Sequence, residues 1–157
     1  MALTGSDNYF EDFTVGDVYR HARGKTIMEY DNVGTTLQVM NTAEGHFNEH
    51  LMQNSGAIFP QRVNFGGVTI ATVVGLAMQD TGENALREIG MDKIRLKSPV
   101  FHGDTLYAFS EVLGTEEGDA PDTGIVHFKH YGVNQEDKLV FEGERRVLVK
   151  KRGWGGK

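Results

Sequence analysis

Hydrophobic positions are unevenly spread along this chain, and the densest set lies between Gly67 and Asp80, in the segment GVTIATVVGLAMQD. Its apolar residues cover every side of a helix instead of one stripe, which is typical of an enclosed helix. Val, Ile and Thr are also frequent in buried strands, so a strand is the alternative interpretation. The length of the run, with Ala, Leu and Met in its second half, favours a helix.

A second apolar pattern precedes this run. Hydrophobic residues recur at spacings of three and four at Ile27, Tyr30, Val33, Leu37 and Met40. This spacing predicts a helix over residues 27–40. The residues from Thr26 to Glu29 have the form of a capping box for its first turn. We also expect a strand over residues 18–25 and a short helix over residues 48–54.

The second half of the chain has the pattern of strands. Residues 92–97 alternate with period two, so that Ile94 and Leu96 share one face and basic residues the other. Three more strands are predicted over residues 106–112, 125–133 and 139–149. They are separated by a loop over residues 114–124 and a turn over residues 134–138.

This order of elements predicts an α+β fold with an antiparallel β-sheet wrapped around a central apolar helix, which is the hot-dog architecture. We expect a single domain over residues 1–157, with residues 1–8 loosely held and a basic, glycine-rich tail over residues 151–157. The sheet encloses the helix on one side only. We therefore expect a second copy of the chain to close the other side, in a homodimer or a higher homo-oligomer.

Composition excludes several classes of protein. The chain carries 22 acidic and 16 basic residues, a formal charge of −6, which predicts no binding to nucleic acid or to an anionic membrane. Cysteine is absent, which excludes disulfides, thiolate metal sites and a cysteine nucleophile. No run approaches the ~20 apolar residues of a membrane span, and the first residues lack a secretory signal pattern. These observations predict a cytoplasmic protein.

The most suggestive chemistry lies between Asn41 and Gly67. His46 stands in a polar loop, and a histidine exchanges protons near neutral pH because its reference pKa is ~6.5. Gly66 and Gly67 open the apolar helix, where backbone N–H groups lack intrahelical partners and can bind a developing negative charge. From these residues alone, a loop or helix-cap histidine is the better explanation of His46. A simple turn before a helix explains Gly66 and Gly67 equally well.

Several motifs carry a resemblance to a known family. The N-terminal signature of MaoC-like hydratases and dehydratases resembles YFEDFTVGD, and their hydratase motif resembles NTAEGHFN. The single-domain relatives of mesaconyl-CoA and β-methylmalyl-CoA hydratases are similar to this chain in VNFGGVTIATVVGL, DTGENAL and SPVFHGDTLYAFSEVL. The resemblance extends over most of residues 9–150.

The resemblance implies roles for individual residues. His46 falls on the catalytic histidine, Asn41 on its Asp or Asn partner, and Gly66 on the glycine whose N–H polarises the thioester carbonyl, with Gly67 beside it. The chain departs from the family motif at Glu44-Gly45, which replaces Pro-Leu, and at Asn48, which replaces Asp. Either His46 performs the acid–base chemistry with Asn41 orienting the water or the imidazole, or Glu44 contributes.

The implied activity is that of a lyase, the reversible syn addition of water to an α,β-unsaturated acyl-CoA. The acyl group suggested is mesaconyl or another short branched enoyl group, and CoA is part of the substrate, so no separate cofactor is expected. Lys93, Arg95 and Lys97 either pair with CoA phosphates or form a solvated polar face. We expect no metal, because His127 and His130 face opposite sides of a strand and no other ligand spacing occurs.

Two other functions stay open at this stage. Hot-dog thioesterases usually place a carboxylate on or near the central helix, and the absence of one between Gly66 and Gln79 counts against that activity. A non-catalytic acyl-CoA-binding subunit is kept open by Asn41, Glu44 and Asn48.

Overall fold

A computed structural model describes residues 7–155 of the chain. Its strands are β1 (Val18–Thr26), β2 (Ala85–Leu96), β3 (Thr105–Glu117), β4 (Thr123–Val133) and β5 (Leu139–Lys150). Its α-helices are α1 (Thr35–Gln38), α2 (Glu49–Asn54) and α3 (Gly66–Thr81). Short 3-10 turns occur at Phe10–Asp12 and Glu44–His46, and a π-helical turn at Tyr30–Gly34.

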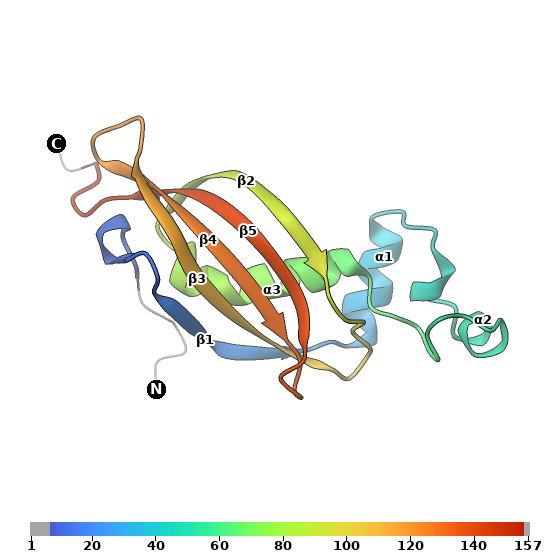
Figure 1. The fold of residues 1–157 in the computed structure, drawn as a ribbon. Helices are drawn as coiled ribbons and strands as arrows, with labels where there is room; N and C mark the ends of the chain where they lie inside the picture. The colour runs from blue at the N-terminus through green and yellow to red at the C-terminus, as the bar shows by residue number, and fades with distance from the viewer. Residues whose placement is uncertain (1–6, 156–157) are drawn as a thin grey trace.

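The five strands form one antiparallel sheet in the order β1-β3-β4-β5-β2, and α3 lies along its concave side (Figure 1). The buried side of α3, with Val68 and Val73, packs against residues of the sheet such as Leu106 and Phe141. At Gly132 of β4 an added Cβ would lie 2.4 Å from a methyl group of Val73, so glycine allows this close approach. The predicted hot-dog arrangement and the central helix are confirmed.

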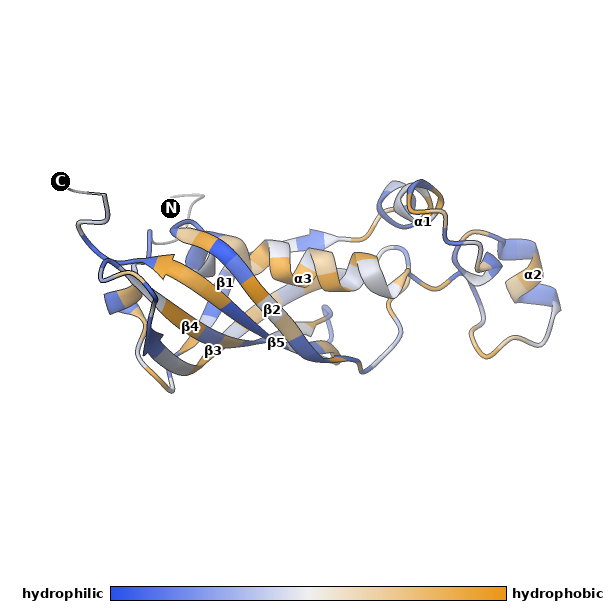
Figure 2. Cartoon of the chain, turned by 90° about the horizontal axis from the view of Figure 1, so that it is seen from above, coloured by the Kyte–Doolittle hydropathy of each residue, from blue (hydrophilic) through white to orange (hydrophobic). Residues whose placement is uncertain are grey.

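Figure 2 shows α1 and α2 extending past the end of the sheet, away from the two chain termini. The loops that carry the predicted site residues lie at this end, between β1 and the first turn of α3. Among residues 7–155, the helices fall short of the length and apolarity that crossing a membrane requires.

The helix predicted over residues 27–40 is shorter and buries a different side. The helical turns run from Tyr30 to Gln38, and Tyr30 and Leu37 are exposed, although Ile27 is buried. The buried residues of these turns are Asn32 and Thr36, which are polar. The spacing of apolar residues therefore predicted the wrong side of this helical segment to be buried.

The predicted capping box was also wrong. Thr26 is the last residue of β1, and its hydroxyl lies 2.8 Å from that of Thr105. The amide of Met28 is bound by the carboxylate of Asp31, at 2.8 Å.

All five strands are longer than predicted, and β2 and β3 differ most from the prediction. β2 starts at Ala85 instead of residue 92, and β3 continues to Glu117, which shortens the predicted loop over residues 114–124. Residues 85–91 lack clean alternation because β2 is an edge strand, exposed beyond its first residue and paired with β5 through three register shifts. Pairing with β5, not burial, makes this segment a strand.

The chain ends are partly tied down. The predictions for residues 1–6 and 156–157 lie outside the described part of the chain. The predicted loose segment also includes residues 7 and 8, where Asn8 donates to the carbonyl of Asp80 at 3.0 Å and Asp7 accepts from Asn84 at 2.6 Å. In the tail, Lys151 and Arg152 form ion pairs with Glu117 and Asp12.

Candidate active site

His46 ends the short turn Glu44–His46, and its ring is held from two sides. The Nδ1 atom lies 2.9 Å from the carbonyl oxygen of Val63, and the ring centroid lies 5.5 Å from that of Phe65. A carbonyl oxygen only accepts, so Nδ1 must carry the proton that it donates. In the neutral ring this leaves a lone pair on Nε2, which can therefore act as a base.

Asn32 connects the loop of His46 to the start of α3. It is fully buried, its Nδ2 donates to the carbonyl of His46 at 2.8 Å, and its Oδ1 accepts from the amide of Phe65 at 2.8 Å. One carboxamide therefore sets the position of the histidine relative to the residue just before Gly66. The sequence analysis missed this residue, since its only signal was a polar position within a helical pattern.

The same carboxamide reaches a second histidine. The Nδ2 of Asn32 lies 3.1 Å from Nε2 of His102, so this ring nitrogen accepts and the neutral imidazole carries its proton on Nδ1. Burial, together with the nearby charge of Arg62, lowers the pKa of His102 below its ordinary value. A neutral His102 preserves the hydrogen bond that helps to fix Asn32.

A cavity of about 380 Å³ lies beside His46 and the first turn of α3. This volume is within the range of ligand-binding pockets. Its walls are mainly apolar, and its lining residues are His46, Phe59, Val63, Asn64, Gly66, Thr69, Leu96, Lys97, Ser98, Pro99 and Val100. The predicted histidine and the predicted glycine therefore meet in one cavity.

Because Gly66 has no side chain, Leu96 packs directly against the start of α3 in the wall of this cavity. A Cβ on Gly66 would lie 2.3 Å from Cδ1 of Leu96, a distance that no side chain could keep. Gly67 lies instead at a separate hollow with Tyr30 and Thr35. The structure thus brings Gly66, but not Gly67, to the cavity of His46.

The other predicted participants lie outside the cavity lining. Asn41 accepts through Oδ1 from the amide of Ala43, at 3.0 Å, in a local turn. Glu44 is exposed, and its carboxylate lies 3.4 Å from Nδ2 of Asn48. Within the described chain, neither Asn41 nor Glu44 is placed to touch a molecule in the cavity, and their roles stay predictions.

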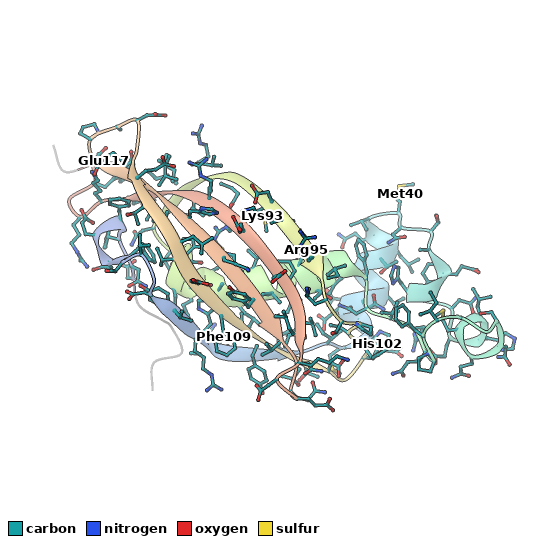
Figure 3. All side chains as sticks on the ribbon, viewed as in Figure 1. Met40, Lys93, Arg95, His102, Phe109 and Glu117 are labelled. Carbon is teal, nitrogen blue, oxygen red and sulfur yellow. The ribbon has the colours of Figure 1, made fainter. Side chains whose placement is uncertain are left out.

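The basic residues expected to hold CoA phosphates are paired with carboxylates of β5. Lys93 lies 3.0 Å from Glu144, while Arg95 and Lys97 lie 3.8 and 3.9 Å from Glu142 (Lys93 and Arg95 are labelled on β2 in Figure 3). The hydrogen bond from Lys93 lowers the pKa of Glu144. This pattern fits a solvated polar face, although Lys97 also lines the cavity.

A metal site is not assembled from the described side chains. Among residues 7–155, no three His, Asp or Glu side chains are grouped closely enough to hold a metal ion.

Residues 3–151 match the family described as mesaconyl-CoA hydratase. The chain is 32% identical to the β-methylmalyl-CoA dehydratase of Chloroflexus aurantiacus, over 96% of this chain and 42% of that protein. It is 31% identical to the mesaconyl-CoA hydratase of Haloarcula marismortui, over 95% of this chain and 44% of that protein.

Solved structures of MaoC-like and hot-dog proteins superpose on this chain. A structure described as a MaoC domain protein dehydratase, from Chloroflexus aurantiacus, superposes with a TM-score of 0.87 and 31% identity, over 97% of this chain and 43% of that chain. A Mycobacterium tuberculosis protein with a double hot-dog fold superposes with a TM-score of 0.80 over 92% of this chain and 44% of its own, and at 22% identity it supports the fold alone. The chain spans less than half the length of the curated relatives that it matches. Over almost its whole length, the chain belongs to the mesaconyl-CoA hydratase family.

Proposed function

We propose that this chain is a lyase that reversibly adds water to the double bond of an α,β-unsaturated acyl-CoA. The observation that carries the proposal is that His46, with Nε2 free to act as a base, lines one cavity with Gly66 at the start of α3. The relatives named above support a short branched or dicarboxylic acyl group, such as mesaconyl, as the substrate.

The geometry supports the following steps. The Nε2 atom of His46 takes a proton from water while the water oxygen bonds to the β-carbon. Negative charge develops on the thioester oxygen, where the N–H of Gly66 can donate to it; one such donor contributes on the order of 3 kcal/mol. The imidazolium then returns its proton to the α-carbon on the same face, which completes a syn addition.

A hot-dog thioesterase fits this chain less well. The only carboxylate on α3 is that of Asp80, near the end of the helix away from the cavity, and it lies 2.6 Å from Nδ1 of His21. It is therefore not available as a base or nucleophile beside Gly66.

We also infer that the working form is a homodimer in a cytoplasmic setting. The edge strand β2 exposes apolar side chains at Leu86, Ile89, Met91, Ile94 and Leu96, and α3 leaves Ala71 and Gly75 exposed on its outer side. A long apolar edge strand is a ready template for pairing with another chain. A second copy is the best-supported occupant, because the relatives are more than twice as long and one structural neighbour has two hot-dog units in one chain.

The central experiment follows loss of the conjugated thioester absorbance with crotonyl-CoA and with mesaconyl-CoA. We expect turnover by the parent protein and a loss of at least a hundredfold in His46→Ala, the size typical of a lost general base. His50→Ala, on the exposed helix α2, is the matched control and should keep full activity.

Two results would contradict the proposal. Release of free CoA thiol from saturated acyl-CoA would indicate a thioesterase. Saturable binding of CoA esters without change in the enoyl absorbance would indicate a non-catalytic binding subunit.

A further inference from the structure

Asn64 is a buried polar residue in the wall of the cavity, for which the sequence suggested no role. Its side chain is almost fully buried, with 4% of the residue exposed, and its backbone amide donates to Val100 at 2.7 Å. The Nδ2 atom donates to the hydroxyl of Thr69, at 2.9 Å. The Oδ1 atom has no hydrogen-bond partner among residues 7–155.

An unpaired buried oxygen is unfavourable, because it has lost its hydrogen bonds to water without replacement. Native proteins pair most such atoms, and an exception inside a binding cavity points to a ligand or an ordered water as the missing partner. In the structure the Nδ2 end of the carboxamide faces Thr69, and the Oδ1 end is left without a partner. The free end is an acceptor, so its partner must bring an O–H or N–H group.

The reaction proposed above has such a group. An attacking water has two O–H bonds, and only one of them points to Nε2 of His46. A second acceptor is needed to stop the water from rotating and to direct its lone pair toward the β-carbon. Asn41, the expected partner, is bonded to Ala43 and does not line the cavity.

We propose that Oδ1 of Asn64 accepts the second hydrogen of the attacking water and, after addition, that of the β-hydroxyl group. Asn64 exchanges no proton: the C–O bond forms at the β-carbon, and His46 carries one water proton to the α-carbon. Thr69 acts through Asn64 by holding its carboxamide. This assignment rests on the proposed hydratase function.

The test compares two reactions of the full-length chain. The first is hydration of crotonyl-CoA or mesaconyl-CoA, which needs the attacking water. The second is exchange of the α-protons of butyryl-CoA in D₂O, which needs the base and the amide donor but no addition of water. The variants are Asn64→Leu, which keeps the side-chain size, Asn64→Asp, which keeps an acceptor, and Thr69→Val.

We expect Asn64→Leu to lose about a hundredfold in kcat for hydration, with KM and α-proton exchange within threefold of the parent. Asn64→Asp should retain at least a tenth of the parent kcat for hydration. The kcat of Thr69→Val should lie between those of the parent and of Asn64→Leu.

Three outcomes overturn the assignment. Unchanged hydration by Asn64→Leu refutes it while leaving the proposed function intact. Equal loss of hydration and exchange shows that Asn64 only supports the shape of the site. A parent protein that catalyses neither reaction refutes the hydratase function itself, and the role of Asn64 with it.

Discussion

Asn32 donates a hydrogen bond to the carbonyl oxygen of His46 across a gap of 14 residues in sequence, at 2.8 Å, while its own oxygen accepts from Phe65. The buried carboxamide thus joins the loop that carries His46, the proposed base, to the residue that precedes Gly66, the proposed oxyanion donor. The proposed hydration depends on the distance between these two groups, so Asn32 would support it without lining the cavity.

Replacing Asn32 should weaken both fold and activity. In Asn32→Ala the carbonyl of His46 and the amide of Phe65 lose a buried partner, at a cost of about 1–3 kcal/mol each. We expect a lower free energy of unfolding in urea and a kcat reduced at least tenfold. Asn54→Ala, which removes a bond to the carbonyl of His50 on the exposed helix α2, is the control and should change neither quantity. A fully active and equally stable Asn32→Ala would show that the link is dispensable.

The contact between Gly66 and Leu96 can be tested by a double-mutant cycle. Gly66→Ala places a methyl group where Cδ1 of Leu96 lies, and the exposed Leu96 side chain must move away from it, so we expect a loss of hydration activity with little change in stability. Adding Leu96→Ala should relieve this clash and recover part of the activity. If the two substitutions have additive effects, the contact does not limit the site.

A buried chain of hydrogen bonds predicts a pH dependence of stability. Asp80 lies 2.6 Å from Nδ1 of His21, the Nε2 of His21 lies 2.7 Å from the Ser110 hydroxyl, and that hydroxyl lies 2.7 Å from Nδ1 of His130. The Nε2 of His130 has no partner among residues 7–155. Burial, reinforced by the charge of Arg145, lowers the pKa of His130 to about 3.

His130 is therefore neutral in the folded chain, while it titrates near ~6.5 when unfolded. Protonation favours the unfolded state, so this contribution is fully present above pH ~6.5 and is lost progressively as the pH falls toward 3. We expect the free energy of unfolding of the parent to fall by up to about 1.4 kcal/mol per pH unit from this group alone.

The matched variant is His130→Phe, which cannot be protonated. The free energy of unfolding of this variant, measured in urea, should depend less steeply on pH between 6.5 and 4 than that of the parent. Carboxylates contribute to the pH dependence of both proteins. Identical slopes would mean that His130 does not control acid stability.

The proposed dimer predicts a specific sensitivity of β2. In light scattering the parent should have twice the mass of one chain. The Ile89→Lys variant should have the mass of a single chain, because the lysine would bury a charge at the interface. Val15→Lys, at an exposed hydrophobic position in the turn before β1, is the control and should remain dimeric. A parent that is monomeric at micromolar concentration would contradict this arrangement.

Some features of the site were accessible from the pattern of residues, and others were not. His46 and Gly66 lie in motifs that resemble those of the family, so each could be proposed as a site residue by its position in those motifs. Asn32 and Asn64 could not, since asparagine is usually exposed and the sequence does not show that these two are buried near His46. The sequence did not reveal the ion-pair partners of Lys93, Arg95 and Lys97. These partners, Glu142 and Glu144, are about 50 residues away along the chain.

The order of residues alone established that the segment after Gly66 is an apolar helix and that the second half of the chain forms strands. Those properties depend on the local period of apolar residues, which neighbouring positions reveal. Three features became visible in the folded chain alone: which side of residues 30–38 faces inward, that β2 begins at Ala85, and that Asn64 lines the cavity of His46. These depend on hydrogen bonds and strand pairing between distant segments, which leave no periodic trace in the sequence.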